Sequence, residues 1–122
     1  METATHQSTL LILALLLVTF SGGTGLTLAI AILSKKKTSS VSMYMHGVLS
    51  ATGLILIVAY FIRHADNFPV RIVLFFVITA LLGFFMFSKD IRQKPIRPLA
   101  VVFTHVLFAL LSILSLVDWC FF

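Results

Sequence analysis

Apolar residues dominate four long stretches of the chain, and short polar segments separate them. The stretches cover residues 10–33, 41–62, 69–87 and 98–122. Each stretch carries at most one charged residue, which lies near one of its ends. An α-helix needs about 20 mostly apolar residues to cross a bilayer. The runs are too long, and alternate too little, for the strands of a transmembrane β-barrel. The pattern therefore predicts four transmembrane helices.

The connections between these stretches are short, and they predict the topology. They cover residues 34–40, 63–68 and 88–97. Short connections make neighbouring helices antiparallel, so we expect an all-α, up-down-up-down four-helix bundle that forms one transmembrane domain over residues 1–122. Residues 1–9 contain no Lys or Arg, which a signal peptide normally carries before its apolar core. We therefore interpret the first stretch as a retained helix. We see no internal repeat.

Composition supports this class of protein and excludes others. Of the 122 residues, 60% are hydrophobic and 11% are charged. Soluble domains are about 45–50% apolar and about 25% charged. A soluble globular enzyme, a disordered tail and a nucleic-acid binder are therefore excluded. The single cysteine, Cys120, cannot form an internal disulfide. Phenylalanines in the third stretch are expected to face lipid: Phe75, Phe76, Phe84, Phe85 and Phe87.

The distribution of basic residues predicts the orientation. Seven of the nine Lys and Arg residues lie in connections 34–40 and 88–97. Lys and Arg concentrate in cytoplasmic loops, so we expect these two connections in the cytoplasm and both termini on the other side. Trp119 fits the aromatic belt of the outer interface. We expect an integral protein of a bacterial inner membrane. The net charge of +5 thus indicates topology rather than contact with nucleic acid.

Two histidines are the candidate functional residues, because ionisable groups deep in a membrane are rare and usually functional. His46 lies five residues after position 41 and His105 seven residues after position 98, or about 8 and 10 Å of helix rise. The second and fourth helices run in the same direction and sit diagonally in the bundle. We therefore expect the two imidazoles to face each other in the cytoplasmic half. Imidazole is a common axial ligand of haem iron.

Glycines near the level of these histidines suggest room for a flat cofactor. Four of them are predicted to line a haem site: Gly22, Gly25, Gly47 and Gly83. Haem propionates are carboxylates, and Arg97 lies eight residues before His105 at the start of the fourth helix. Arginine pairs with carboxylates through its planar fork, so Arg97 is the candidate propionate partner. His6, in the N-terminal tail, and His64, in the outer connection, are expected to be solvated.

A purely structural interpretation of the same residues stays open. Small residues at membrane helix interfaces commonly serve close packing. A membrane histidine also commonly forms a hydrogen bond to a neighbouring polar group. Three such groups lie close to the histidines in sequence: Ser50, Thr104 and Ser112. The protein would then be an accessory or assembly subunit of a larger membrane complex.

The arrangement resembles the membrane-bound b-type cytochromes, in which helical bundles hold haem between histidines on different helices. It is also similar to small four-helix bacterial membrane proteins with a His-Gly in the second span, a Gly-Phe in the third and a His in the fourth. The corresponding residues here are His46-Gly47, Gly83-Phe84 and His105. The resemblance covers most of residues 41–110 and implies haem b. With two deep histidines, one haem is the maximum.

Three functions follow from this sequence. The first is electron transfer by one haem b with His46 and His105 as metal ligands. Its partner would be a membrane quinone or a larger membrane complex. The protein could also form a homo-oligomer. The second is the accessory subunit. The third, a proton-coupled transporter, lacks the membrane-embedded carboxylate that such transport usually needs. The chain is therefore expected to be an electron carrier or a subunit rather than an enzyme.

Overall fold

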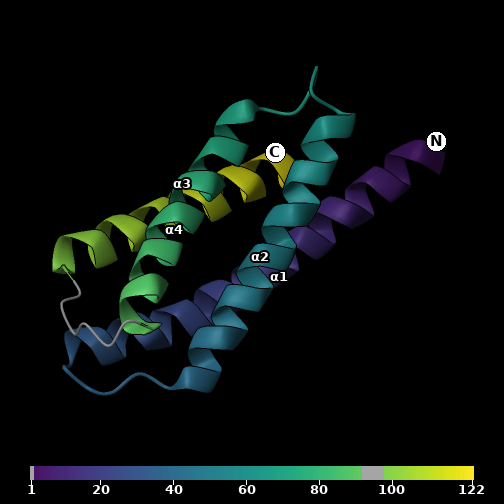
Figure 1. Ribbon diagram of the computed structural model, residues 1–122. Coiled ribbons are helices and arrows are strands. Elements are labelled where there is room, and N and C mark those ends of the chain that lie inside the picture. The colour runs from purple at the N-terminus through teal and green to yellow at the C-terminus, as the bar shows by residue number, and fades with distance from the viewer. Residues whose placement is uncertain (1, 92–97) are drawn as a thin grey trace.

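The computed structural model describes residues 2–91 and 98–122, with side chains for 9–89 and 98–122. These residues form four helices, as predicted: α1 (Glu2–Leu33), α2 (Ser40–Arg63), α3 (Val70–Ile91) and α4 (Leu99–Phe121) (Figure 1). Each helix contains a segment of 20 to 25 residues that is long and apolar enough to cross a membrane. An α-helix satisfies its backbone hydrogen bonds internally, which makes it suitable for a lipid environment.

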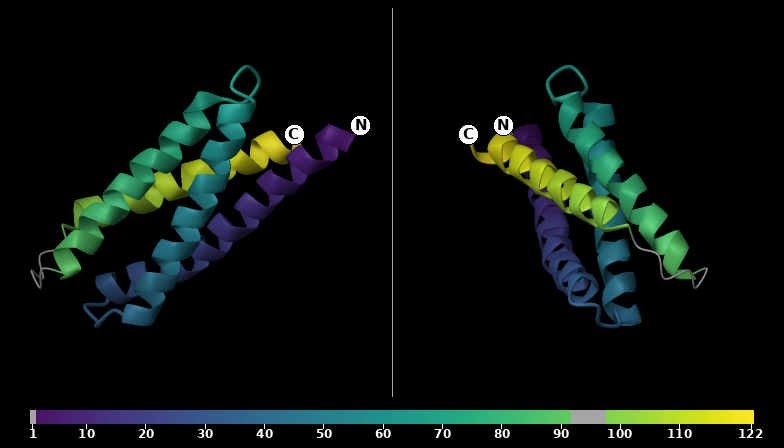
Figure 2. Two further views of the ribbon diagram at one scale, coloured as in Figure 1. Left: turned by 45° about the vertical axis from the view of Figure 1, so that its right-hand side comes forward. Right: turned by 90° about the vertical axis from the view of Figure 1, so that its left-hand side faces the viewer.

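The four helices form two antiparallel hairpins. α1 packs most extensively against α2, and α3 against α4, whereas α1–α4 and α2–α3 contacts join the hairpins. In the described part of the chain, the backbones of the diagonal pairs α1–α3 and α2–α4 do not approach each other closely, so these helices meet only through side chains. Both termini and the α2–α3 connection lie at one end, which we call the terminal end (Figures 1 and 2). The connection 34–39 lies at the opposite end, which we call the lysine end.

Local signals define the connection at the lysine end. Lys35 follows α1 with a φ of 56°, and the N–H of Lys36 donates to the Ala31 carbonyl at 2.8 Å. This left-handed residue with a hydrogen bond across the helix end is a common way for helices to stop. Ser39 then starts α2, because its hydroxyl accepts the N–H of Ser42 at 3.4 Å. Such a cap satisfies one of the free donors of the first turn.

The packed core occupies the terminal end of the bundle. Its buried members are Leu11, Ala14, Leu15, Val18, Ile57, Phe68, Ile72, Phe76 and Leu116. The expectation that Phe76 faces lipid is wrong, because its side chain is only 7% exposed and belongs to this core. The prediction placed Phe76 from the density of phenylalanines in α3, which does not show which side of the helix packs against α4. The two hairpins are therefore held together mainly at the terminal end.

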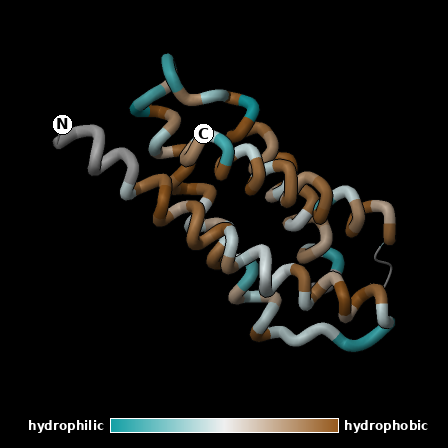
Figure 3. Tube along the Cα trace, turned by 180° about the vertical axis from the view of Figure 1, so that it is seen from behind, coloured by the Kyte–Doolittle hydropathy of each residue, from teal (hydrophilic) through white to brown (hydrophobic). Residues whose placement is uncertain are grey.

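Hydropathy along the chain matches a membrane position. Figure 3 shows hydrophobic residues along the helices and hydrophilic residues concentrated in the connections at the ends. Many large apolar side chains point outward, including Leu16, Ile55 and Leu81, which are all more than 60% exposed. Lipid tails are as apolar as these side chains, so their exposure is normal for a membrane bundle.

Candidate functional site

A pocket of about 570 Å³ lies between the two hairpins and extends toward the lysine end. All four helices contribute to its wall, and most of the lining side chains are apolar. None of the described residues that line it is charged. Pockets for small ligands and cofactors typically measure about 300–1,000 Å³ and combine apolar walls with a few polar groups. The polar groups here include both deep histidines, His46 from α2 and His105 from α4.

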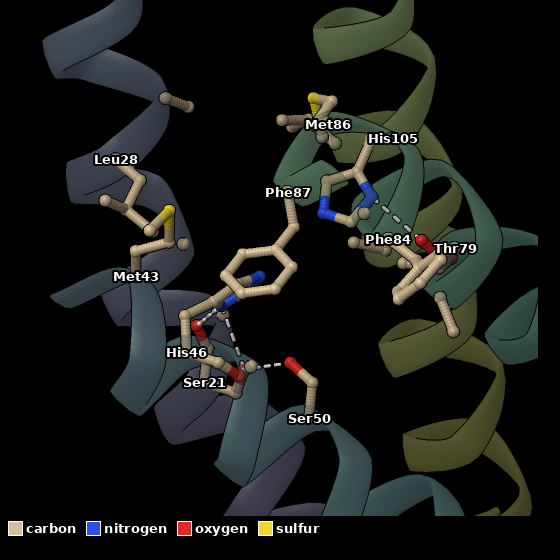
Figure 4. A pocket seen from close by; sticks show the side chains of 18 of the residues that line it. Ser21, Leu28, Met43, His46, Ser50, Thr79, Phe84, Met86, Phe87 and His105 are labelled. Carbon is tan, nitrogen blue, oxygen red and sulfur yellow. Dashed lines mark hydrogen bonds between the residues drawn. The ribbon is translucent and has the colours of Figure 1, made fainter. Parts of the chain in front are cut away.

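His46 is fixed by α1, the other helix of its own hairpin. Its Nδ1 lies 2.8 Å from the Ser21 backbone oxygen and 3.0 Å from the Ser21 hydroxyl (Figure 4). The Ser21 hydroxyl also donates to the His46 carbonyl at 3.1 Å and contacts the Ser50 hydroxyl. A carbonyl oxygen can only accept, so the hydrogen of the ring lies on Nδ1. The lone pair of the neutral ring therefore lies on Nε2.

His105 is fixed in the same way by α3. Its Nδ1 lies 2.9 Å from the Thr79 backbone oxygen, so this nitrogen also carries the hydrogen (Figure 4). The Thr79 hydroxyl donates to the Phe75 carbonyl at 2.8 Å and approaches the Ser112 hydroxyl at 3.3 Å. Each histidine therefore forms its backbone hydrogen bond within its own hairpin, and the lone pair lies on Nε2 in both rings.

Two of the predicted glycines contact the imidazoles directly. A Cβ atom on Gly25 would lie 2.7 Å from Cε1 of His46. A Cβ atom on Gly83 would lie 3.0 Å from Cε1 of His105. The sequence predicted that these glycines leave room for a cofactor plate, whereas the structure shows them making room for the histidine rings. The helix surfaces at these points accept an imidazole because no side chain is present.

The two imidazoles face each other across the pocket. Their ring centroids are 6.1 Å apart and their planes are inclined by 77°. Among the described residues, no group forms a hydrogen bond with Nε2 of either ring. Figure 4 shows the hydrogen-bonded nitrogen of His105 turned toward Thr79 and the second nitrogen turned away from it. The site therefore combines two fixed rings with two free nitrogen lone pairs.

The other predicted site residues have different surroundings. Gly22 and Gly47 both line the pocket. A Cβ on Gly22 would lie 3.3 Å from Ile113 Cδ1, whereas a Cβ on Gly47 would meet nothing within 4 Å. Arg97, the predicted propionate partner, lies outside the described residues. Tyr44 lines the pocket as well, and its ring packs edge-on against Phe87 with centroids 5.9 Å apart.

Sequence reasoning missed the partners of the histidines. It named Ser50, Ser112 and Thr104, but the Thr104 hydroxyl donates to the Ala100 carbonyl of its own helix. The actual partners are Ser21 and Thr79, which were not among the candidates. A signal was available, since each lies four residues before a glycine, Gly25 or Gly83. In a helix, a residue and the one four positions later share a face.

The remaining titratable groups of interest lie at the terminal end, away from the pocket. His64 packs against Tyr60 with ring centroids 4.5 Å apart. Cys120 is half-buried and packs against the core. The side chain of His6 lies outside the described residues. Within the part of the chain that the structure describes, no cluster of three or more His, Cys, Asp or Glu side chains is placed to hold a metal ion.

No family model, no curated protein and no solved structure matches this chain, so the site is interpreted from its own geometry.

Proposed function

We propose that this protein binds one b-type haem between His46 and His105 and acts in electron transfer within the membrane. One observation carries the proposal. Two imidazoles on different hairpins face one apolar pocket, each with Nδ1 held by a backbone carbonyl and Nε2 free. Metal-ligating histidines almost always donate their other ring N–H to a carbonyl, a carboxylate or water, which fixes the tautomer.

The residues present fit this cofactor. Two imidazoles bound to one metal at about 2 Å each would place their ring centroids about 6 Å apart, and the observed separation is 6.1 Å. The angle of 77° is compatible, because each ring can rotate about its own metal–nitrogen bond. Haem iron needs only two protein ligands, since the porphyrin supplies the others, so a cluster of three metal-binding side chains is not required. The uncharged, mainly apolar wall suits the macrocycle.

When bound, haem supplies a one-electron redox centre. With His46 and His105 as its two protein ligands, the iron would favour electron transfer over oxygen binding. The carbonyls of Ser21 and Thr79 would hold the rings and raise their basicity as ligands. We further propose that the protein lies in a bacterial inner membrane with the lysine end in the cytoplasm, as the basic residues of the connections favour. A membrane quinone or a larger membrane complex would be the redox partner.

An absorption spectrum of the purified full-length protein tests the proposal. Protein from haem-replete cells should show the spectrum of six-coordinate low-spin b-type haem, with one haem per chain. His46→Ala and His105→Ala should each abolish that spectrum, because each variant would lack one of the two proposed ligands. His64→Ala is the matched control, since His64 lies at the terminal end beside Tyr60 and should leave the spectrum unchanged. A folded wild-type protein that retains no haem after incubation with excess haem and removal of the unbound haem would refute the proposal.

A second candidate, the accessory subunit, is favoured by one feature of the same site. Both histidines already form a hydrogen bond to the neighbouring helix of their own hairpin, as purely structural histidines would. Under this alternative, the pocket would be filled by a helix or lipid of a larger complex. Replacing either histidine should then lower the thermal stability of the bundle without any change of colour.

A further inference from the structure

The hydrogen bonds of the two histidines define a register in which the two hairpins correspond. Ser21 and Gly25 of α1 match Thr79 and Gly83 of α3, which lie 58 positions later. His46 of α2 matches His105 of α4, 59 positions later. Each histidine is the seventh residue of its helix, since α2 begins at Ser40 and α4 at Leu99.

Burial follows the same register beyond the pocket, toward the terminal end. Ala14 in α1 and Ile72 in α3 are both fully buried and are also 58 positions apart. Ile57 in α2 and Leu116 in α4 are both fully buried and are 59 positions apart. These pairs are independent of the histidines, because they belong to the core at the terminal end. Two hairpins that run in the same direction, with equivalent fully buried positions and equivalent histidine-to-backbone hydrogen bonds, are the pattern of a parallel internal repeat.

The glycine has a definite place in this repeated unit. In a helix, the carbonyl of residue i points toward residue i+4, where a side chain normally stands close to it. With glycine at that position, the imidazole can lie against the helix and donate its N–H to the carbonyl. In hairpin α1–α2, the His46 ring lies against Gly25 and donates its N–H to the Ser21 backbone oxygen. The observed Nδ1–oxygen distance is 2.8 Å. The other hairpin repeats the arrangement at 2.9 Å.

We infer that the two hairpins are copies of one histidine-docking unit, and that Gly25 and Gly83 are positioning residues that fix the two imidazoles in the same tautomer. The pocket lies between the two units, so it offers one Nε2 lone pair from each side. This suits a ligand with two equivalent faces, such as a planar metal macrocycle. The assignment of Gly25 and Gly83 to ligand positioning rests on the proposed haem function, whereas the docking geometry itself does not.

Nuclear magnetic resonance of the apo full-length chain in detergent tests the docking geometry without haem. Long-range proton–nitrogen correlations of nitrogen-15-labelled histidine distinguish the two ring tautomers. We expect the Nδ1–H tautomer for both His46 and His105 in the wild type. Gly25→Ala should remove it for His46 only, and Gly83→Ala for His105 only. Gly23→Ala is the matched control, because a Cβ there would meet nothing within 4 Å.

The loaded protein gives a second, separate measurement. Loss of a hydrogen-bonding partner of a metal ligand typically lowers metal affinity about 10- to 100-fold. We expect that reduction in haem affinity for both Gly25→Ala and Gly83→Ala, and none for Gly23→Ala. An Nε2–H tautomer for either ring in the wild type would overturn the inference, even if haem binds. Two Nδ1–H tautomers in a chain that binds no haem would sustain the docking units and refute the haem proposal.

Discussion

Gly53 of α2 offers a sharp test of how the first hairpin packs. A Cβ at this position would lie 2.5 Å from Cγ1 of Val18, while the next nearest atoms, Ala14 O and Val18 N, would lie at 3.5 Å. Non-bonded carbon atoms are normally about 3.5–4.0 Å apart, so Gly53→Ala requires a shift of about 1 Å. Valine in a helix has one strongly preferred rotamer and cannot easily turn aside. The two helices must therefore separate.

The magnitude follows from two opposing effects. Overpacking a well-packed contact costs about 1–3 kcal/mol. Alanine in a helix interior is more favourable than glycine by about 0.5–1 kcal/mol. We therefore expect Gly53→Ala to lower the free energy of unfolding by about 0.5–2 kcal/mol. In a Val18→Ala background the colliding methyl group is absent, so Gly53→Ala should raise it by about 0.5–1 kcal/mol.

Reversible unfolding in mixed detergent and SDS micelles, followed by circular dichroism, measures these free energies. All variants are compared without added haem, since any bound ligand would add its own stabilisation. Gly23→Ala, which has open space at its Cβ, is the control and should stabilise the protein. A change in the free energy of unfolding with the same sign in the wild-type and Val18→Ala backgrounds would refute the clash between Gly53→Ala and Val18.

Three further predictions concern orientation, core and connection. A reporter fused after Phe122 should be active only as a non-cytoplasmic form, because seven of the nine basic residues lie in connections 34–40 and 88–97; activity of a cytoplasmic reporter would reverse the orientation. Phe76→Ala should lower the free energy of unfolding by about 1–3 kcal/mol, less than in a soluble core because lipid also solvates the ring. Phe20→Ala, at a ring that is 66% exposed, should change it by less than about 0.5 kcal/mol, and equal effects would contradict the packing. Lys35→Gly should raise the free energy of unfolding by up to about 1 kcal/mol, because Lys35 has a left-handed φ of 56° that glycine adopts without steric cost. A lower free energy of unfolding would argue against that conformation.

The helices were predictable because apolar run length in a membrane protein is a direct physical constraint. The observed α2 extends only one residue beyond the predicted stretch 41–62 at each end. α1 begins at Glu2 rather than near residue 10, and α3 continues to Ile91 rather than ending near residue 87. Both extensions carry polar residues, and hydropathy cannot separate a helix that continues beyond the apolar stretch from one that ends there. Hydropathy predicts the apolar part of a helix and not its polar turns.

The pairing of the histidines was predictable from depth, whereas their partners were not. Counting residues from the helix starts placed His46 and His105 at one level, and their rings are 6.1 Å apart. Their hydrogen bonds, however, go to backbone oxygens of Ser21 and Thr79, and every residue of a helix has such an oxygen. The glycine four residues later marks these two carbonyls, but the carbonyls of four other residues share that feature: Val18, Thr19, Met43 and Leu49. Its meaning becomes visible when the helices are placed side by side.

The repeat was not predicted from the sequence because few equivalent positions of the two hairpins hold identical residues. Its equivalent core positions hold different side chains, Ala14 against Ile72 and Val18 against Phe76, although all four are buried. A membrane core accepts such exchanges when neighbouring volumes compensate, because van der Waals packing drives helix association in lipid. Hydrogen bonds are more specific than packing, and so the docking residues preserve the register more clearly than the core does.

Separate parts of the bundle determine the orientation of the rings and their separation. Each ring is oriented within its own hairpin, by the Ser21 carbonyl with Gly25 or by the Thr79 carbonyl with Gly83. The spacing between hairpins is instead determined at the terminal end, where Ile57 and Leu116 belong to one buried core with residues of α1 and α3. Substitutions in that core should therefore change the distance between the rings while leaving the tautomers intact. Substitutions at the two glycines should do the reverse, so the two contributions to a shared ligand site can be separated experimentally.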